Sequence, residues 1–397
     1  MQRDFAPDYA SIPAHGRWQH FNVGGRDRIA NLLASWGKDV DPSERTRRLL
    51  DLFLISVLLD AGAGNSWTYK SRENQRIYRR SEGLAIASLE MFKSGMFSSN
   101  TTQPYQVDSD GLKELTVESM KQALQVTESN PIAGLEGRTS LLTNLADALL
   151  NTQIFGADGR PGNMLGMSFP LAVLLAYASG FAMVSHIFKA NFNSDYLISH
   201  PRTVASSIPI VPLPVLWSVL IDGLAPIWPS SRTTIDGTSL GDAWPSRVLQ
   251  STLLPTSQPW EGIVPFHKLT QWLCYSLMQP MTKLMNIHFA GAHLMTGLPE
   301  YRNGGLFIDT GVLSLKEKDS ARGLEEFHRN AMREGKRGVE VTPMFRPDDD
   351  VVVEWRAVTV GFLDRLLIEV NKSLSLQGNE RLTLPQMLEA GSWKVSP

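Results

Sequence analysis

The chain has 397 residues, which is long enough to bury a large core in one domain or two. Hydrophobic residues make up 43% and charged residues 20%, a globular composition that excludes wholesale disorder. Lys and Arg number 38 against 40 for Asp and Glu, giving a net charge of −2, so we expect no nucleic-acid partner. We also expect no metal and no other cofactor, because there is one cysteine and the histidines lack metal-binding spacing.

Helical patterns dominate the first part of the chain. After an opening arginine, residues 48–59 read Leu-Leu-Asp-Leu-Phe-Leu-Ile-Ser-Val-Leu-Leu, with apolar side chains on every side, as in a helix buried within a large core. Residues 71–93 predict a helix of mixed charge that Gly95 would end. Apolar residues then fall on one helical face in 112–124 and again in 141–149.

Two apolar stretches approach the length of a membrane span. The first, 164–188, carries no formal charge but contains Pro170 and His186, and we interpret it as a buried helix. The second, 208–228, is broken by prolines and Asp222, and we interpret it as an irregular packed connection. We therefore expect no membrane partner. The absence of an apolar signal region at the N-terminus predicts an intracellular, cytoplasmic protein.

Helices resume after a long connection rich in Pro, Ser and Trp. The later helical patterns cover 266–285, 314–335 and 350–376. No alternating strand pattern rises above them, so we predict an all-α fold. The chain would form a single helical domain over 1–397, with two lobes, about 1–195 and 265–397, as the alternative division.

The most informative segment is 295–309. It places Glu300, Tyr301, Arg302 and Asp309 around a Gly-Gly pair between apolar runs, which predicts a loop. Charged groups that a rigid scaffold holds on a loop are typical of binding and catalytic sites. The alternative is a surface ion pair beside an ordinary turn.

Asp60 ends the apolar helix 48–59. A carboxylate there opposes the helix dipole and faces desolvation, so it requires either a partner or a function. The glycines that follow allow a sharp turn that brings Asn65 and Trp67 toward the same end. The alternative is a helix cap with a solvated Asp60.

Two further groups of polar and aromatic residues lie on predicted helices. Lys268 and Trp272 share one face of the helix 266–285, where a lysine beside an aromatic ring would suit a phosphorylated, planar ligand. An ordinary half-exposed surface is the alternative. Glu354 and Arg356 flank a tryptophan, and an internal salt bridge is the stronger interpretation of that pair.

Several segments, in this order, resemble the uracil-catabolism protein family. They are Leu-Leu-Asp-Ala-Gly-Ala-Gly-Asn-Ser-Trp (58–67), Arg-Ser-Glu-Gly-Leu-Ala-Ile-Ala-Ser (80–88), Phe-His-Lys-Leu-Thr-Gln-Trp (266–272), Thr-Gly-Leu-Pro-Glu-Tyr-Arg-Asn-Gly-Gly (296–305) and Glu-Trp-Arg-Ala-Val-Thr-Val (354–360). The resemblance spans 15–394. That family belongs to the route that opens the uracil ring and releases urea, so the resemblance implies a role in pyrimidine degradation.

A more distant similarity is to queuosine-salvage proteins, which are helical N-glycosylases of a modified ribonucleotide. It rests on the stretch ending at Trp67, on 266–271, on 300–302 and on 354–356. The resemblance implies a helical N-glycosylase fold and cleavage of an N-ribosyl bond. Glu300 stands where the salvage enzymes use a catalytic aspartate, so its reach toward the sugar would differ by one methylene.

Together the resemblances imply a hydrolase that converts ribosylurea 5-phosphate to urea and ribose 5-phosphate. Glu300 would stabilise the oxocarbenium-like centre electrostatically or as a transient nucleophile. Asp309 or Glu354 would protonate the departing urea if either is buried enough to stay protonated. Lys268 and Arg302 would hold the phosphate.

The other substrate-binding candidates would wall the pocket or contact the sugar, and they are Asp60, Asn65, Trp67, His267, Trp272, Tyr301 and Arg356. Two alternatives remain open at this point. One is an N-glycosidase for another modified nucleotide. The other is a non-catalytic protein of the same pathway that binds a nucleotide.

Overall fold

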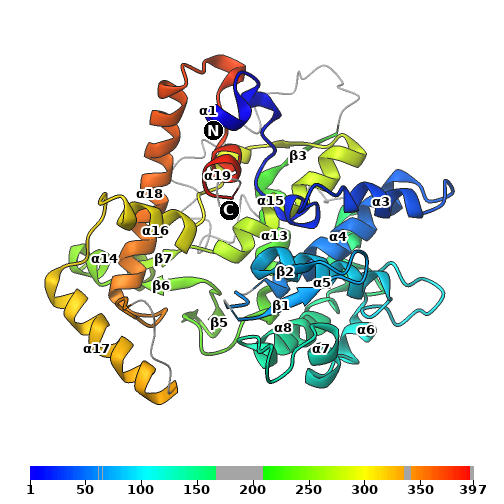
Figure 1. The fold of residues 1–397 in the computed structure, drawn as a ribbon, viewed down its shortest axis with the longest axis horizontal. Coiled ribbons are helices and arrows are strands. Elements are labelled where there is room, and N and C mark those ends of the chain that lie inside the picture. Colours follow the sequence, from blue (N-terminus) through cyan, green and yellow to red (C-terminus); the bar gives the residue numbers. More distant parts are fainter. Residues whose placement is uncertain (61, 65, 167–208, 335–340, 394–397) are drawn as a thin grey trace.

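The structure is a computed structural model that describes residues 1–60, 62–64, 66–166, 209–334 and 341–393 (Figure 1). Helices dominate these ranges, and the strands pair only two at a time. The fold is therefore mostly helical, as the periodicity predicts. Figure 1 shows α16, α17 and α18 gathered at one side of the molecule and α3 to α8 at the other.

The helices fall before and after the undescribed stretch 167–208. Those before it are α1 (Gln2–Phe5), α2 (Arg17–Phe21), α3 (Arg28–Ser35), α4 (Pro42–Leu59), α5 (Arg80–Lys93), α6 (Ser109–Lys113), α7 (Val117–Ala123), α8 (Leu135–Ala148) and α9 (Thr152–Phe155). Those after it are α13 (Leu213–Gly223), α14 (Arg247–Thr252), α15 (Lys268–Met285), α16 (Tyr301–Asp309), α17 (Glu317–Glu334), α18 (Asp350–Ser373) and α19 (Leu384–Leu388).

Short strands tie distant segments of the chain together. The antiparallel pairs are β1 (Thr68–Lys70) with β2 (Ile77–Arg79), β4 (Thr234–Ile235) with β5 (Thr238–Ser239), and β6 (Ala243–Pro245) with β7 (Ile263–Pro265). The parallel pair is β3 (Ile210–Pro212) with β8 (His288–Ala290). Strands β7 and β8 lie just before and just after α15. Their partners β6 and β3 therefore attach the stretch before α15 to the two ends of that helix.

Helix α4 is the centre of the hydrophobic core. Its N-cap, Asp41, accepts a hydrogen bond from the backbone NH of Glu44 at 2.8 Å, and Pro42 occupies the first turn, where its missing NH is not needed. Residues 49–59 are all buried, which confirms the interpretation of this segment as a core helix. It packs against α2, α5, α8 and α15, so it contacts helices from before and after the undescribed stretch 167–208. The two-lobe division stays a prediction.

Three predicted helical segments in the first half of the chain need correction or fall outside the described residues. The segment 71–93 opens as the β1–β2 hairpin, with Gln75 at φ 59°, and becomes helical only in α5; Gly95 at φ 76° does end that helix. The segment 112–124 is divided between α6 and α7, because Thr116 forms a capping box that starts a new helix. The predicted helix at 164–188 lies almost wholly outside the described residues.

The connection before α15 is more regular than predicted. Its apolar stretch 208–228 contains α13, because Pro214 sits in the first turn, where proline is compatible with a helix. The segment 295–309 was predicted to be a loop, but its second half is α16. Gly304 allows that helix to cross α18 closely, since a Cβ there would lie 2.5 Å from the Trp355 ring. No helix within the described ranges is long and apolar enough to cross a membrane.

Candidate functional site

The loop before α16 is held against α15. Tyr275 donates its hydroxyl proton to the carbonyl oxygen of Thr296 at 3.1 Å, and Thr296 NH donates to Gln271 Oε1 at 3.4 Å. Leu298 is buried, and its carbonyl oxygen accepts a hydrogen bond from Asn303 Nδ2 at 2.8 Å. These contacts fix the chain on both sides of Glu300, which is the N-cap residue of α16.

Only one of the two oxygens of the Glu300 carboxylate has a partner among the described residues. Its Oε2 lies 3.2 Å from Lys268 Nζ, and the Glu300 side chain is 14% exposed against 39% for Lys268. Its Oε1 is buried and accepts no hydrogen bond from the described residues. A buried polar atom without a partner costs about 1–3 kcal/mol, so a ligand that approaches Oε1 with a donor or a positive centre would be stabilised there.

Helix α2 brings a buried cation to the same region. Arg17 and His20 are three residues apart, so both project from one face of this short helix. The Arg17 side chain is fully buried; its Nη1 lies 2.7 Å from Asp60 Oδ2, and its Nε donates to Ser56 Oγ at 2.6 Å. Asp60 thus has the partner that its position at the end of α4 requires.

His20 is neutral beside Arg17. Burial lowers the pKa of His20 well below its usual value, and the charges of Arg17, His15 and Arg302 lower it further. Arg17 Nη1 lies 3.1 Å from His20 Nδ1. Since a guanidinium group can only donate, Nδ1 is the acceptor and the ring proton is on Nε2. Arg302, in the first turn of α16, is thus one of the charges that act on His20.

Trp272 lies between the Arg17–His20 pair and the Lys268–Glu300 pair. Its ring centroid lies 5.3 Å from Arg17 Cζ and 5.6 Å from the His20 ring, and it follows Lys268 by one helical turn on α15. Its indole Nε1 is buried, with no acceptor among the residues that the structure describes. We call the resulting group the Glu300 cluster, and its members are Arg17, His20, Lys268, Trp272, Glu300 and Arg302.

Arg356 supports the cluster from outside. Its Nη1 and Nη2 bind the two oxygens of Asp242 at 2.8 and 2.6 Å, and its Cζ lies 4.1 Å above the Phe266 ring. Asp242 Oδ2 also accepts a hydrogen bond from Lys268 NH at 3.0 Å. Burial would raise the pKa of Asp242, but the hydrogen bonds and charge of Arg356 outweigh it and lower this pKa to about 2. The pair therefore fixes the start of α15.

The internal salt bridge predicted for Glu354 and Arg356 is wrong, because Arg356 binds Asp242 and Glu354 lies 3.7 Å from Lys316. His267 immediately precedes α15 at φ 45°, and its NH donates to the carbonyl oxygen of Asp242 at 2.9 Å. Its ring lies 6.0 Å from that of Trp217, and burial lowers the pKa of His267. Arg356 and His267, which were both predicted to bind substrate, thus lie at the N-terminal end of α15.

Other candidates lie apart from the Glu300 cluster. Trp67 is fully buried, and its Nε1 donates to the carbonyl oxygen of Leu124 at 2.9 Å, which is a core position. The Tyr301 ring is 86% exposed and packs 5.8 Å from Trp355, so it does not enclose a pocket in this structure. Asn65 lies outside the described residues.

The two candidate proton donors do not meet the condition set for them. Asp309 is exposed at the last turn of α16, and Glu354 is exposed on α18, 3.7 Å from Lys316. The condition was burial, and neither side chain is buried, so we leave both outside the proposed site.

Sequence reasoning missed Arg17, His20 and Asp242. The spacing of Arg17 and His20 is a helical one, but α2 is too short to show a periodic pattern. Asp242 lies in the long connection before residue 266, where no helical pattern was predicted. Within the described ranges, no cluster of histidine, cysteine and acidic side chains is suited to hold a metal ion.

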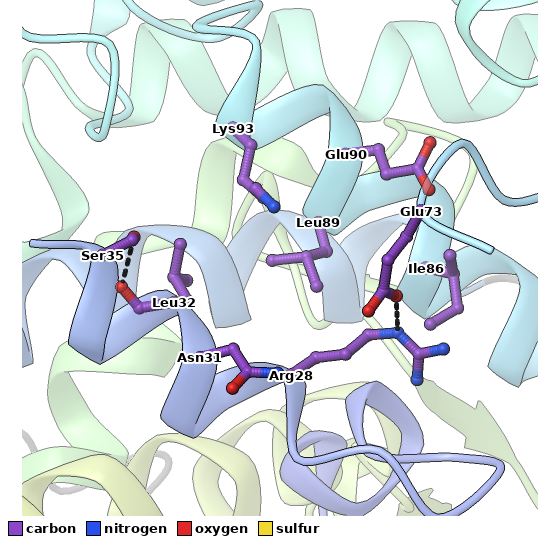
Figure 2. Close-up of a pocket in the computed structure, with 9 residues that line it drawn as sticks. All are labelled: Arg28, Asn31, Leu32, Ser35, Glu73, Ile86, Leu89, Glu90 and Lys93. Carbon is purple, nitrogen blue, oxygen red and sulfur yellow. Dashed lines mark hydrogen bonds and ion pairs between the residues drawn. The ribbon is translucent and has the colours of Figure 1, made fainter.

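A separate surface pocket lies between α3 and α5 (Figure 2). Figure 2 shows Arg28 on one wall, bound to Glu73, with Lys93 reaching in from the opposite wall. Arg28 Nε and Glu73 Oε2 are 2.7 Å apart. The pocket shares no lining residue with the Glu300 cluster, and this ion pair compensates the charge of Arg28.

Comparison with known proteins places the chain in a family. It is 42% identical over 401 residues to "Uracil catabolism protein 4" of Lachancea kluyveri, which covers all of this chain and 82% of the yeast protein. It is 41% identical over 395 residues to "Protein urg3" of Schizosaccharomyces pombe, covering 99% of this chain and 80% of that protein. A family model described as "Protein of unknown function (DUF1688)" matches residues 1–396. The chain belongs to the DUF1688 family.

Proposed function

We propose that this protein acts in uracil catabolism and hydrolyses the N-ribosyl bond of ribosylurea 5-phosphate to give urea and ribose 5-phosphate. The pathway assignment is supported by the name of the Lachancea kluyveri relative, which is 42% identical over all of this chain. The chemical assignment is carried by one observation: Glu300 keeps a buried carboxylate oxygen without a hydrogen-bond partner among the described residues, beside a lysine and a tryptophan.

The reaction suits that carboxylate. The bond between the ribose C1′ and the ureido nitrogen breaks with its electron pair on nitrogen, and positive charge develops at C1′ and the ring oxygen. Glu300 Oε1 would stabilise this charge, either directly or through a transient bond to C1′. A water molecule then supplies hydroxide to C1′ and a proton to the departing nitrogen. Lys268 holds the other oxygen, Oε2, and so orients the carboxylate.

The remaining members of the Glu300 cluster fit a phosphorylated sugar. Arg302 follows Glu300 in the first turn of α16, where a guanidinium group could grip phosphate through two hydrogen bonds. Lys268 has three donor positions and is partly exposed, so it can contact phosphate as well as Glu300. The Trp272 ring supplies an apolar wall that excludes water.

The experiment compares the wild-type protein with Glu300→Gln and Asp309→Asn. Each is incubated with ribosylurea 5-phosphate, and urea and ribose 5-phosphate are followed by mass spectrometry. We expect Glu300→Gln to lose on the order of 10³-fold in turnover, because a preorganised charge at the reacting centre is removed. Asp309→Asn, an exposed carboxylate on the same helix, should keep wild-type turnover.

Thermal shift with the same ligands separates the alternatives, since a ligand that binds only the folded state raises the melting temperature. Full turnover by Glu300→Gln would refute the assignment of the central carboxylate. Stabilisation by ribosylurea 5-phosphate without product would refute hydrolysis and leave a binding protein. Stabilisation only by nucleotides that carry an aromatic base would point to a different glycosidase.

A further inference from the structure

Two buried hydrogen-bond donors of the Glu300 cluster are unused. One is Arg17 Nη2 and the other is Trp272 Nε1, and neither has an acceptor in the part of the chain that the structure describes. The Arg17 Cζ atom lies 5.3 Å from the centroid of the Trp272 ring, so the two side chains are in contact. A buried donor without an acceptor is destabilising, and an acceptor on a ligand would relieve that cost.

The charge around Arg17 decides what kind of acceptor fits. Asp60 already neutralises the guanidinium group at 2.7 Å, and Ser56 Oγ and the Ser81 carbonyl oxygen accept two more of its hydrogen bonds. His20, which also accepts from Arg17, is neutral. A phosphate dianion would gain little net electrostatic attraction here, because Asp60 neutralises Arg17, and it would have to lose its hydration. A neutral carbonyl oxygen matches the remaining Nη2 donor better.

We propose that Arg17 and Trp272 bind the carbonyl oxygen of the ureido group, and so form the leaving-group subsite of the reaction proposed above. His20 is a positioning residue, because its Nδ1 accepts from Arg17 Nη1 and orients the guanidinium group. The inference rests on the proposed function for the identity of the ligand.

The subsite gives the leaving group a means to depart without a carboxylic acid. As the C1′–N bond breaks, its electron pair spreads from the ureido nitrogen to the ureido oxygen. Donors from Arg17 and Trp272 to that oxygen stabilise the developing negative charge. The water that adds to C1′ then returns a proton to the nitrogen, and the products are neutral urea and ribose 5-phosphate. The exposure of Asp309 and Glu354 is consistent with this route.

An unused donor is not sufficient evidence by itself. Arg160 is also buried, pairs with Asp51 at 2.6 Å, and has an Nη2 atom for which the described residues provide no acceptor. Arg160 lacks the other features that surround Arg17. These are a neutral histidine, a tryptophan whose NH has no acceptor, and a nearby carboxylate with one unpaired oxygen. Arg160 is therefore a matched control for the burial and pairing of Arg17.

The test compares the binding of two ligands that differ by the ureido group. Calorimetry would measure the affinity for ribosylurea 5-phosphate and for ribose 5-phosphate in a Glu300→Gln background, where turnover is suppressed. Arg17→Lys and Trp272→Phe should each weaken ribosylurea 5-phosphate about tenfold, the loss of one net hydrogen bond, and leave ribose 5-phosphate unchanged. Arg160→Lys should lower the melting temperature without changing the ratio of the two affinities.

The outcomes separate this inference from the proposed function. Equal weakening of both ligands by Trp272→Phe, which keeps an aromatic ring but removes the NH donor, would show a contact to sugar or phosphate and overturn the subsite. Selective weakening in a protein that never releases urea would support the subsite and refute hydrolysis. Failure of the Glu300→Gln protein and the wild type to bind either ligand would refute both proposals.

Discussion

Two buried arginine–aspartate pairs lie along helix α4 and differ in their surroundings. Asp51, in the middle of the helix, accepts from Arg160 Nε at 2.6 Å and from Gly162 NH at 2.7 Å, and Arg160 Nη1 reaches Glu44 at 3.1 Å. Asp60, at the C-terminal end, binds Arg17, which faces His20 and Trp272. The two aspartates are about 14 Å apart along the helix axis.

The comparison shows why burial alone does not identify a functional residue. Arg160 is enclosed by two carboxylates, an arrangement that ties α4 to the segment after α9. Arg17 binds a single carboxylate, and its guanidinium group also lies near the rings of His20, Phe21 and Trp272. The Arg160–Asp51 pair is explained by a role in stability. The Arg17–Asp60 pair also belongs to a cluster of polar groups that lack some of their hydrogen-bond partners.

Removing the cation from the Asp51 pair should have the largest effect on stability. Arg160→Met leaves a buried carboxylate unpaired, so we expect the free energy of unfolding at pH 8 to fall by about 3–5 kcal/mol. Burial already raises the pKa of Asp51 to about 6 even with Arg160 present. A carboxyl group with a raised folded-state pKa lowers stability as the pH rises from its unfolded pKa of about 4 to its folded pKa. Without Arg160 the pKa of Asp51 should rise further and the cost should keep growing above pH 6, so the loss should shrink as the pH falls from 8 toward 4.

Guanidinium chloride unfolding of Arg160→Met at pH 8, 6 and 4 would check this prediction. Turnover of the folded variant should equal that of the wild type. A loss that stays constant across this range, or a large drop in turnover of folded protein, would mean that the two pairs on α4 do not differ as described.

The Asp242–Arg356 pair provides an intermediate case, since it supports α15 without joining the cluster. The pKa of Asp242 is lowered to about 2, from an unfolded value of about 4. A lowered folded-state pKa stabilises above the unfolded value, and this contribution is lost as pH falls through 2. It corresponds to about 2 kcal/mol at neutral pH.

Asp242→Asn should therefore lower the free energy of unfolding by about that amount at pH 7. The difference from the wild type should close between pH 4 and pH 2, which unfolding curves at three pH values would show. A difference that persists unchanged at pH 2 would contradict a role for the ionised carboxylate.

The smallest effect is expected at Glu354. Its carboxylate is exposed, 3.7 Å from an exposed lysine, and such pairs contribute about 0–1 kcal/mol. Glu354→Gln should leave both the melting temperature and urea release near wild-type values. A marked loss of turnover would return Glu354 to the site and weaken the contrast between buried and exposed carboxylates.

Some of this structure could be predicted from sequence because the information is local. The largely apolar segment 49–59 can bury its side chains only inside a core, and it forms the buried part of α4. The β1–β2 hairpin was missed because its support is remote. Thr68 NH donates to Asn130 Oδ1, and Lys70 NH donates to Gln125 Oε1. No periodicity within 71–93 contains that information.

The candidate site divides in the same way. Glu300, Arg302, Lys268 and Trp272 belong to contiguous segments whose composition and resemblance to known families single them out. Arg17 meets them only through the packing of α2 against α15, across most of the chain. The loop expected at 295–309 is partly helical because Gly304 lets α16 approach Trp355 closely, a tertiary contact that composition does not reveal.

The most direct test of the central claim is a single-turnover incubation of ribosylurea 5-phosphate with an excess of wild-type or Glu300→Gln protein. Mass spectrometry would count urea and ribose 5-phosphate against the substrate consumed. The account predicts equimolar release of both products by the wild type and almost none by Glu300→Gln. Intact substrate in the presence of folded wild-type protein would contradict it.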